Sequence, residues 1–213
     1  PLTAFGGTGD GLYRLTTEPM PQTCGGACTA LTGVAVDQAG RVLLAKRGWN
    51  GLGRCAGRPT VERLTPDGVI DPAFGANGGA DITGVDLCAG ALVFGARNDD
   101  GIVVGGSGVV IGLDASGSRD TNFGSTGLLS LASSVAWSSA QLLPDGGLLL
   151  AGSRPESSQP GIVLAKFNAS GQPDASFGDG TGAVQRDFGE AFFGMSGLQP
   201  HVSAVASAVD DRQ

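Results

Sequence analysis

The sequence predicts an all-β fold assembled from tandem copies of one small four-stranded unit. Three observations predict it: a composition that is rich in glycine yet apolar, a pattern that recurs about every 50 residues, and turn signals between short apolar runs. Glycine takes 38 of the 213 positions, and the hydrophobic fraction is 41%. That much glycine disfavours long helices, while the apolar content suffices for a buried core.

The repeated pattern is clearest at three Asp-x-x-Phe-Gly motifs, Asp71–Gly75, Asp120–Gly124 and Asp174–Gly178. The two ends of the chain resemble parts of the same unit, since Leu2–Gly6 matches the tail of a repeat and Ala206–Gln213 the head of one. We therefore expect one domain over 1–213, with whole repeats at about 33–83, 91–131 and 141–186 and partial ones at 1–15 and 202–213.

Each repeat is expected to form four short strands. The first and second apolar runs are joined by a glycine turn, which is a hairpin signal. A third run, such as 162–167, ends in another turn, and the Phe-Gly corner leads to a fourth strand, as at 128–131 and 183–186. Small sheets in tandem can bury their faces only against their neighbours, so the repeats favour a β-propeller over a sandwich.

The third repeat carries a resemblance to a known family. It runs from Pro144-Asp-Gly146 through the apolar strand 148–153 and the turn Asn168–Gly171 to Asp174–Gly178. This pattern resembles the delta-60 repeat of bacterial extracellular proteins, a β-propeller repeat, and the other two repeats match it less well. The resemblance implies a propeller, or a fragment of a larger one, in a secreted, periplasmic or cell-surface protein. It implies no catalytic residues, because the family has no shared catalytic motif.

The charge and hydropathy patterns disfavour two kinds of partner, nucleic acids and membranes. The chain has 13 Lys+Arg against 20 Asp+Glu, a formal net charge of −7. Without a basic cluster it cannot neutralise a phosphate backbone, which disfavours nucleic-acid binding. No apolar run approaches the roughly 20 residues of a membrane-spanning helix, so no membrane span is expected.

Four cysteines lie in polar, glycine-rich stretches of the first half: Cys24, Cys28, Cys55 and Cys88. An even count in such places predicts two disulfides and an oxidising compartment. Three pairings are possible, of which we favour Cys55–Cys88 with Cys24–Cys28. Reduced thiols are the alternative, while the spacing disfavours a zinc site.

The connections between strands predict which face binds. The turns between strands 1–2 and 3–4 are uniformly tight and share one face, whereas the long, varied connections share the other. Long loops on a rigid scaffold are where function usually resides. The alternative is that these loops merely vary. The candidate ligand-binding residues on this face are Trp49, Arg54, Arg58, Phe192, Phe193 and His201.

Two functions from different classes follow. The first is an extracellular, non-enzymatic module that binds a protein or a glycan. The second is a secreted hydrolase or lyase whose site lies at the propeller mouth. No catalytic residue is assigned, because the sequence has no nucleophile elbow and a single histidine. The residues available to the enzyme are Asp81, Asp86, Asp187, Glu190, Arg54, Arg58 and His201.

No cofactor or metal site is expected, with a bound calcium ion as the alternative. Gly6–Gly11 and 177–182 echo a calcium-binding nonapeptide, but a turn that serves the fold explains both more simply. The aspartates of the repeated motif are expected to cap the turn before the phenylalanine. Phe74, Phe123 and Phe177 are expected in the core. The partial repeats at the ends suggest a further partner, which is either the rest of the propeller or a strand-donating segment.

Overall fold

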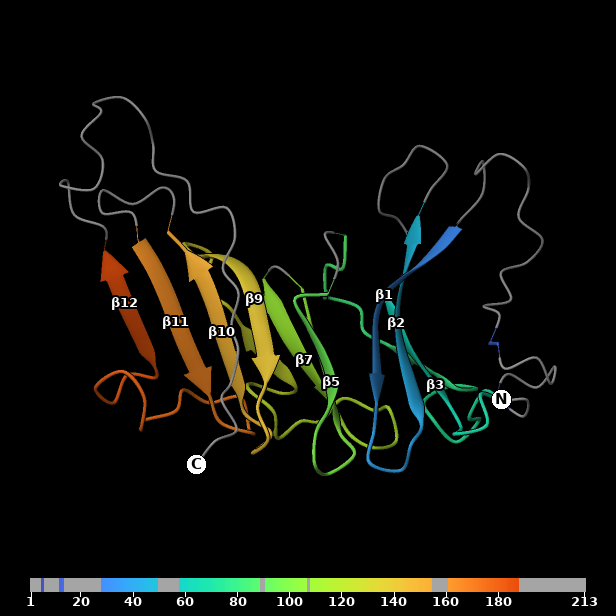
Figure 1. Ribbon diagram of the computed structural model, residues 1–213. Coiled ribbons are helices and arrows are strands. Elements are labelled where there is room, and N and C mark those ends of the chain that lie inside the picture. The colour runs from blue at the N-terminus through green and yellow to red at the C-terminus, as the bar shows by residue number, and fades with distance from the viewer. Residues whose placement is uncertain are drawn as a thin grey trace.

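The computed structural model describes residues 5, 12–13, 28–49, 58–88, 91–106, 108–154 and 161–187. Within these ranges the chain forms three four-stranded antiparallel sheets and no helices (Figure 1). Each sheet is made of four consecutive strands paired in chain order. The all-β class is thereby confirmed, and the three sheets stand where the three whole repeats are expected.

The strands fall close to their expected places. The first sheet contains β1 (Cys28–Val36), β2 (Val42–Trp49), β3 (Thr60–Leu64) and β4 (Gly79–Asp81). The second contains β5 (Val93–Ala96), β6 (Ile102–Gly105), β7 (Val109–Leu113) and β8 (Leu128–Ser130). The third contains β9 (Ala136–Leu142), β10 (Leu148–Ser153), β11 (Gly161–Phe167) and β12 (Ala183–Asp187).

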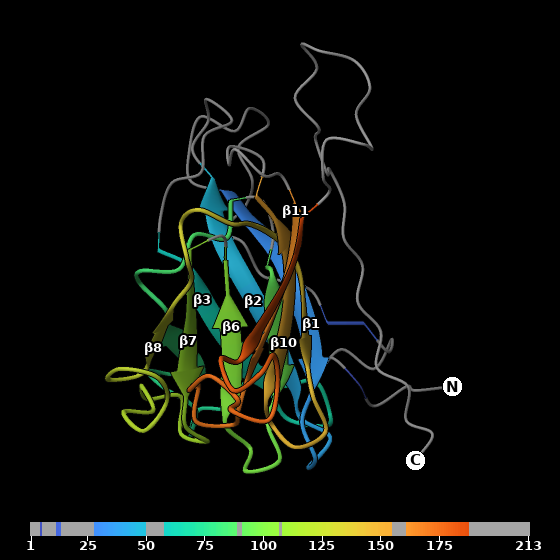
Figure 2. The same cartoon turned by 90° about the vertical axis from the view of Figure 1, so that its left-hand side faces the viewer.

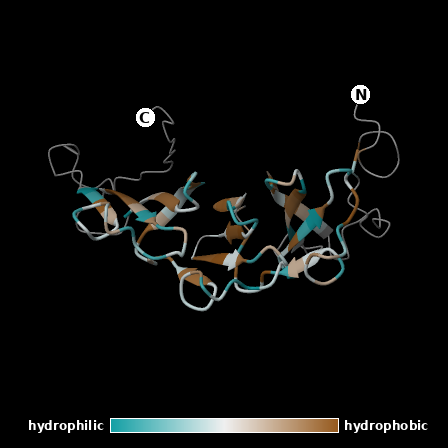
Figure 3. Cartoon of the chain, turned by 90° about the horizontal axis from the view of Figure 1, so that it is seen from below, coloured by the Kyte–Doolittle hydropathy of each residue, from teal (hydrophilic) through white to brown (hydrophobic). Residues whose placement is uncertain are grey.

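The sheets stand side by side with their first strands adjacent. β1 contacts β5, and β5 contacts β9. Viewed from below, the three sheets follow an arc (Figure 3). Their strands share one rough direction, so the connections gather at the two ends of the molecule (Figure 2). This arrangement is what tandem propeller blades require, and each sheet is called a blade below.

Each sheet has two packing faces, which we call rear (toward the preceding sheet) and forward (toward the following sheet). Alternation along a strand assigns neighbouring residues to opposite faces. Leu43 and Val61, on the forward face of the first sheet, are fully buried against Ile102 and Val104 on the rear face of the second. A second cluster joins the second and third sheets in the same way. The core therefore lies between the sheets.

The Phe-Gly corner of one sheet docks on a tight turn of the next. Phe74 and Phe123 are both 0% exposed, which confirms their expected place in the core. A Cβ on Gly117 would lie 2.9 Å from the Phe74 ring, so only glycine lets the ring approach this turn. Phe177 is only half-buried, contrary to expectation, because no further sheet follows the third within the described residues.

The motif aspartates cap the corner as expected. The Oδ1 atoms of Asp71, Asp120 and Asp174 each accept a hydrogen bond from the backbone N–H two residues on, at 2.9–3.0 Å. This is an Asx turn.

The terminal partial repeats lie outside the described residues except for Phe5, Leu12 and Tyr13. Residues 177–182 form a turn in which Asp179 has φ +58°, and Asp179 is exposed. The described part of the chain contains no cluster of three potential metal-ligating side chains.

Candidate functional site

The loop face is the end of the molecule that carries the long connections, and its base is rigid. Residues 82–88 connect β4 toward β5 there, with Ile82, Val85 and Leu87 at most 5% exposed. A Cβ on Gly106, after β6, would lie 1.8 Å from the backbone oxygen of Asp86. The connection is therefore packed down onto two sheets rather than raised above them.

Arg58 and Asp81 form an exposed ion pair on the loop face. Arg58 Nη1 lies 3.0 Å from Asp81 Oδ2, and the two side chains are 80% and 46% exposed. Asp81 Oδ1 also accepts hydrogen bonds from the Thr83 hydroxyl at 2.5 Å and the Thr83 N–H at 2.8 Å. These bonds, followed by Arg58, lower the pKa of Asp81. Asp81 is thus ionised at neutral pH and is unsuited to act as a general acid.

Asp86 and Cys88 are also engaged locally. Asp86 Oδ1 accepts a hydrogen bond from the Cys88 N–H at 2.8 Å, and Arg47 Nη1 donates to the Cys88 carbonyl. Cys88 is disulfide-bonded. The side chains of Cys24, Cys28 and Cys55 lie outside the described residues, so the pairing and the number of bridges stay predictions.

Most other predicted site residues also fall outside the description. Arg54, Phe192, Phe193, His201 and Glu190 are not described, and Trp49 and Asp187 end β2 and β12 without described side chains. Among the described candidates, the structure brings Arg58 and Asp81 into contact.

Sequence reasoning missed a polar hollow on the opposite end, where the tight turns lie. Its volume is about 490 Å³, and it sits between the second and third sheets. It is lined by Arg97, Asp99, Gly101, Asp114, Ala115, Asp120, Asn122, Ala169 and Ser170.

Arg97 holds the two sheets together at the hollow. Its side chain is 6% exposed, and its Nη2 lies 2.6 Å from Asp120 Oδ2. Nη1 donates to the carbonyl of Ala169 in the third sheet, and the guanidinium lies 5.8 Å from the centre of the Phe123 ring. The arginine thus satisfies the motif aspartate and bridges to the next repeat.

Arg63 performs the same task between the first and second sheets, from a different strand. Its Nε lies 2.9 Å from Asp71 Oδ2, its Nη1 donates to Ala115 O at 2.6 Å, and it stacks 4.5 Å from the centre of the Phe74 ring. In the second sheet the position equivalent to Arg63 is Gly112, because each pairs with the corresponding residue of the neighbouring strand.

The repeat pattern therefore did not reveal which basic residue pairs with each motif aspartate. In the third sheet Lys166 occupies the Arg63 position and lies 2.8 Å from Asp174 Oδ2. In the second, the cation arrives from the end of β5. The available signal was the pair of substitutions itself: glycine at 112, and arginine at 97 where the other repeats have Asp37 and Leu143.

Asp114, another carboxylate of the hollow, also serves the fold. Burial acts to raise the pKa of Asp114, but hydrogen bonds from the Ser116 hydroxyl and the Ser116 and Ser118 backbone outweigh it and lower the pKa. Asp114 is thus a turn cap, as Asp120 is. The hollow is explained as a by-product of the joint between two sheets, and we assign it no catalytic role.

Comparison with known proteins agrees with this architecture. A family described as "Domain of unknown function (DUF5122) beta-propeller" matches residues 143–177. Residues 143–177 of this chain are thus similar to a β-propeller family. The match covers β10, β11 and the Phe-Gly corner of the third sheet as far as Phe177, the copy in which the sequence pattern is clearest. The finer delta-60 assignment stays a prediction.

The other comparisons add little. No curated protein matches the chain. A solved structure, the crystal structure of a protein of unknown function from Bacteroides caccae, is similar at 11% identity over 78% of this chain and 84% of that one, with a TM-score of 0.26. A likeness this weak carries no information on fold or function. Within the described blades, no helix is long and apolar enough to cross a membrane.

Proposed function

We propose that the chain is an extracellular, non-enzymatic β-propeller module that binds a protein or a glycan through its loop face. The observation that carries the proposal is the anchored base of that face. Buried Ile82, Val85 and Leu87 hold the β4–β5 connection against the blades. A preorganised platform binds without first having to be ordered, which lowers the entropic cost of association.

Side-chain chemistry also supports the loop face as the binding surface. Arg58 is a strongly exposed cation at its edge, and the predicted Trp49, Phe192 and Phe193 would add aromatic surface. Arginine and aromatic residues are enriched where proteins bind their partners. The extracellular setting is proposed from the cysteines, which we expect to form Cys55–Cys88 and Cys24–Cys28 bridges.

The enzymatic alternative needs at least two carboxylates that converge on a substrate with separated pKa values. Asp81 and Asp86 each cap a turn in their own connection, and the pKa of Asp81 is lowered rather than raised. Both aspartates are therefore accounted for by local structure. This favours the binding module over the hydrolase or lyase.

A glycan array probed with labelled chain 1–213 tests the proposal, with Trp49→Ala and Arg58→Ala as loop-face variants. Asp145→Asn is the matched control, because Asp145 caps a tight turn on the opposite end and asparagine keeps the accepting oxygen. We expect the loop-face variants to lose at least about tenfold in affinity for any bound glycan, a loss of about 1.4 kcal/mol, and the control to bind normally.

Two outcomes would contradict the proposal. One is binding that only the Asp145 variant weakens, which would move the site to the tight-turn end. The other is turnover of chromogenic glycosides or polyuronate that Asp81→Asn abolishes, which would establish the enzyme.

A further inference from the structure

The rear face of the first blade is where a preceding blade would pack. Strand pairing aligns Val36, Leu44 and Glu62 with Ala96, Val104 and Ile111 of the second blade. The residues of the second blade face the first blade and belong to the core between them. The residues of the first blade belong to neither core cluster.

This rear face is covered over one half only. Leu44 on β2 and Leu64 on β3 are 6% and 1% exposed. Val34 and Val36 on β1 are 57% and 60% exposed, although their counterparts Phe94 and Ala96 pack against the core shared with the first blade. The half formed by β2 and β3 is therefore closed, and the half formed by β1 is open.

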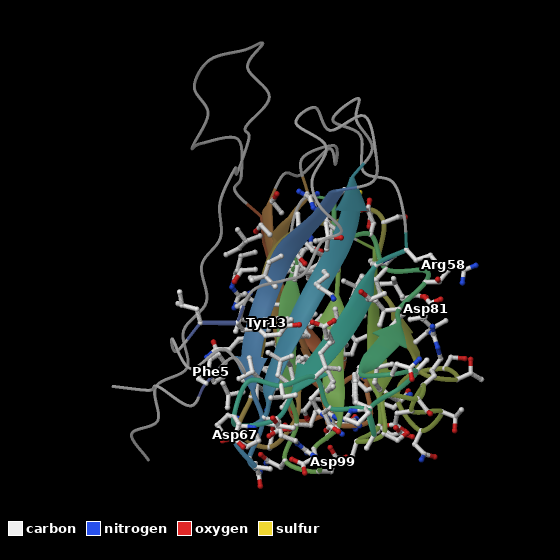
Figure 4. The ribbon with its side chains drawn as sticks, turned by 90° about the vertical axis from the view of Figure 1, so that its right-hand side faces the viewer. Phe5, Tyr13, Arg58, Asp67, Asp81 and Asp99 are labelled. Atoms are coloured by element: carbon white, nitrogen blue, oxygen red, sulfur yellow. The ribbon has the colours of Figure 1, made fainter. Side chains whose placement is uncertain are left out.

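Tyr13 lies over the covered half. Its Oη donates a hydrogen bond of 2.8 Å to Glu62 Oε1, and Lys46 Nζ lies 2.6 Å from Glu62 Oε2. Figure 4 shows Tyr13 and Phe5 on the same side of the first blade, with Phe5 nearer the end where Asp67 lies. Glu62 occupies the place of Ile111 and Ala165 in the other blades, so the charged acceptor stands on the rear face that receives Tyr13.

The repeat pattern gives Phe5 and Tyr13 the same positions. Phe5 precedes Gly6 as Phe74 and Phe123 precede their glycines. Tyr13 stands second after Gly11, as Ala80 and Leu129 stand second after Gly78 and Gly127. Ala80 and Leu129 lie in the cores between blades, at 3% and 7% exposure. Tyr13 thus has the sequence position of a residue that packs on the following blade.

We propose that Phe5 and Tyr13 belong to a further blade, docked on the rear face of the first blade in the same molecule, with Tyr13–Glu62–Lys46 as the polar contact that specifies this joint. The open half at Val34 and Val36 is then the place for the inner strands of that blade. This inference goes beyond the proposed function, because it concerns the assembly of the domain and holds whether or not the loop face binds.

Tyr13 is the only tyrosine, so the absorbance of its phenolate reports on this joint alone. Burial raises its pKa, and the hydrogen bond to Glu62 and the Glu62 charge raise it further. In native chain 1–213 we expect phenolate to form well above pH ~10, and near pH ~10 in denaturant. Glu62→Gln should lower the native midpoint by ~1 pH unit or more. Asp99→Asn, which removes an exposed carboxylate in the second blade, should leave it unchanged.

Hydrogen exchange supplies a readout that does not depend on titration. Tyr13→Ala should speed the exchange of β2 and β3 amides and leave β10 and β11 unchanged, while Tyr13→Phe keeps the ring and should have a smaller effect. A native midpoint near pH ~10, or no change in β2 and β3 for Tyr13→Ala, would overturn the proposal. A midpoint that falls on dilution, together with a dimer by light scattering, would also overturn it, because the segment would then come from a second copy.

Discussion

Arg63 and Arg58 make the same kind of ion pair in opposite environments. The Arg63 side chain is 4% exposed and is enclosed by Asp71, the Ala115 carbonyl and the Phe74 ring. The Arg58 side chain is 80% exposed beside Asp81. Removing one partner of a buried pair leaves a charge without compensation, whereas solvent replaces the partner of an exposed one.

We therefore expect Arg63→Met to lower the free energy of unfolding by about 3 kcal/mol. Arg58→Met should lower it by less than about 1 kcal/mol. Urea unfolding of both variants measures the contrast. Equal losses would mean that Arg63 is not a structural joint between the first two blades.

The Lys166–Asp174 pair predicts a pH dependence. Hydrogen bonds from Lys166 and then from Ser176 lower the pKa of Asp174 to about 2. Because the folded pKa lies below the unfolded value of about 3.9, the pair stabilises the fold above that value, and the stabilisation is lost as pH falls toward 2. Carboxyl NMR should show Asp174 titrating near pH 2, and at a higher pH in Lys166→Met. An unchanged midpoint in that variant would assign the shift to Ser176 instead.

At the scale of the element, the corners of the first and second blades each depend on a glycine in the next blade. Gly117 has φ +85°, and a Cβ there would lie 2.9 Å from the Phe74 ring and 3.0 Å from the Gly75 nitrogen. Gly40 has a similar φ of +76°, but a Cβ there would meet nothing closer than 3.9 Å. Comparing substitutions at Gly40 and Gly117 therefore separates the cost of backbone strain from the cost of steric contact.

Gly40→Ala should cost about 1 kcal/mol, the strain of the left-handed conformation alone. Gly117→Ala should cost a further 1–3 kcal/mol or so, because the added methyl overpacks the corner. Thermal unfolding of the two variants tests this difference. If the two losses are equal, the corner can shift to admit the methyl group.

Strands and corners could be predicted from the sequence because they rest on local signals. Turn glycines, alternating apolar residues and the motif aspartates lie within a few positions of the structure that they specify. The cation that satisfies each aspartate could not be predicted, since Arg97 reaches Asp120 from another strand. Phe177 was misjudged for the same reason, because its burial depends on a neighbouring blade and not on its own repeat.

At the scale of the whole molecule, the cysteines bear both on how the loop face is anchored and on the compartment in which the protein folds. Cys88 is disulfide-bonded at the end of the connection that contributes Ile82, Val85 and Leu87 to the first core. A bridge from Cys88 to Cys55 would tie the β2–β3 connection to this anchored base. The loop face would then be held at two levels, by apolar packing beneath and by covalent bonds above.

Peptide mapping without reductant should recover a Cys55–Cys88 peptide and a Cys24–Cys28 peptide from chain 1–213. Cys88→Ser should lower the free energy of unfolding by about 2–4 kcal/mol. Free thiols at all four positions would remove the argument for an oxidising compartment. A different pairing would keep that argument and change only the connections that are tied.

The exchange between Arg97 and Gly112 has a consequence for how such a chain can change. A Cβ at Gly112 would lie 2.6 Å from the Cβ of Phe123. The Phe123 side chain therefore occupies the space that an arginine side chain at position 112 would need. An arginine at position 112, the place that Arg63 has in the first blade, would therefore require Phe123 to move. The three blades thus share one geometry, although the cation that pairs with the motif aspartate comes from a different sequence position in the second blade than in the other two.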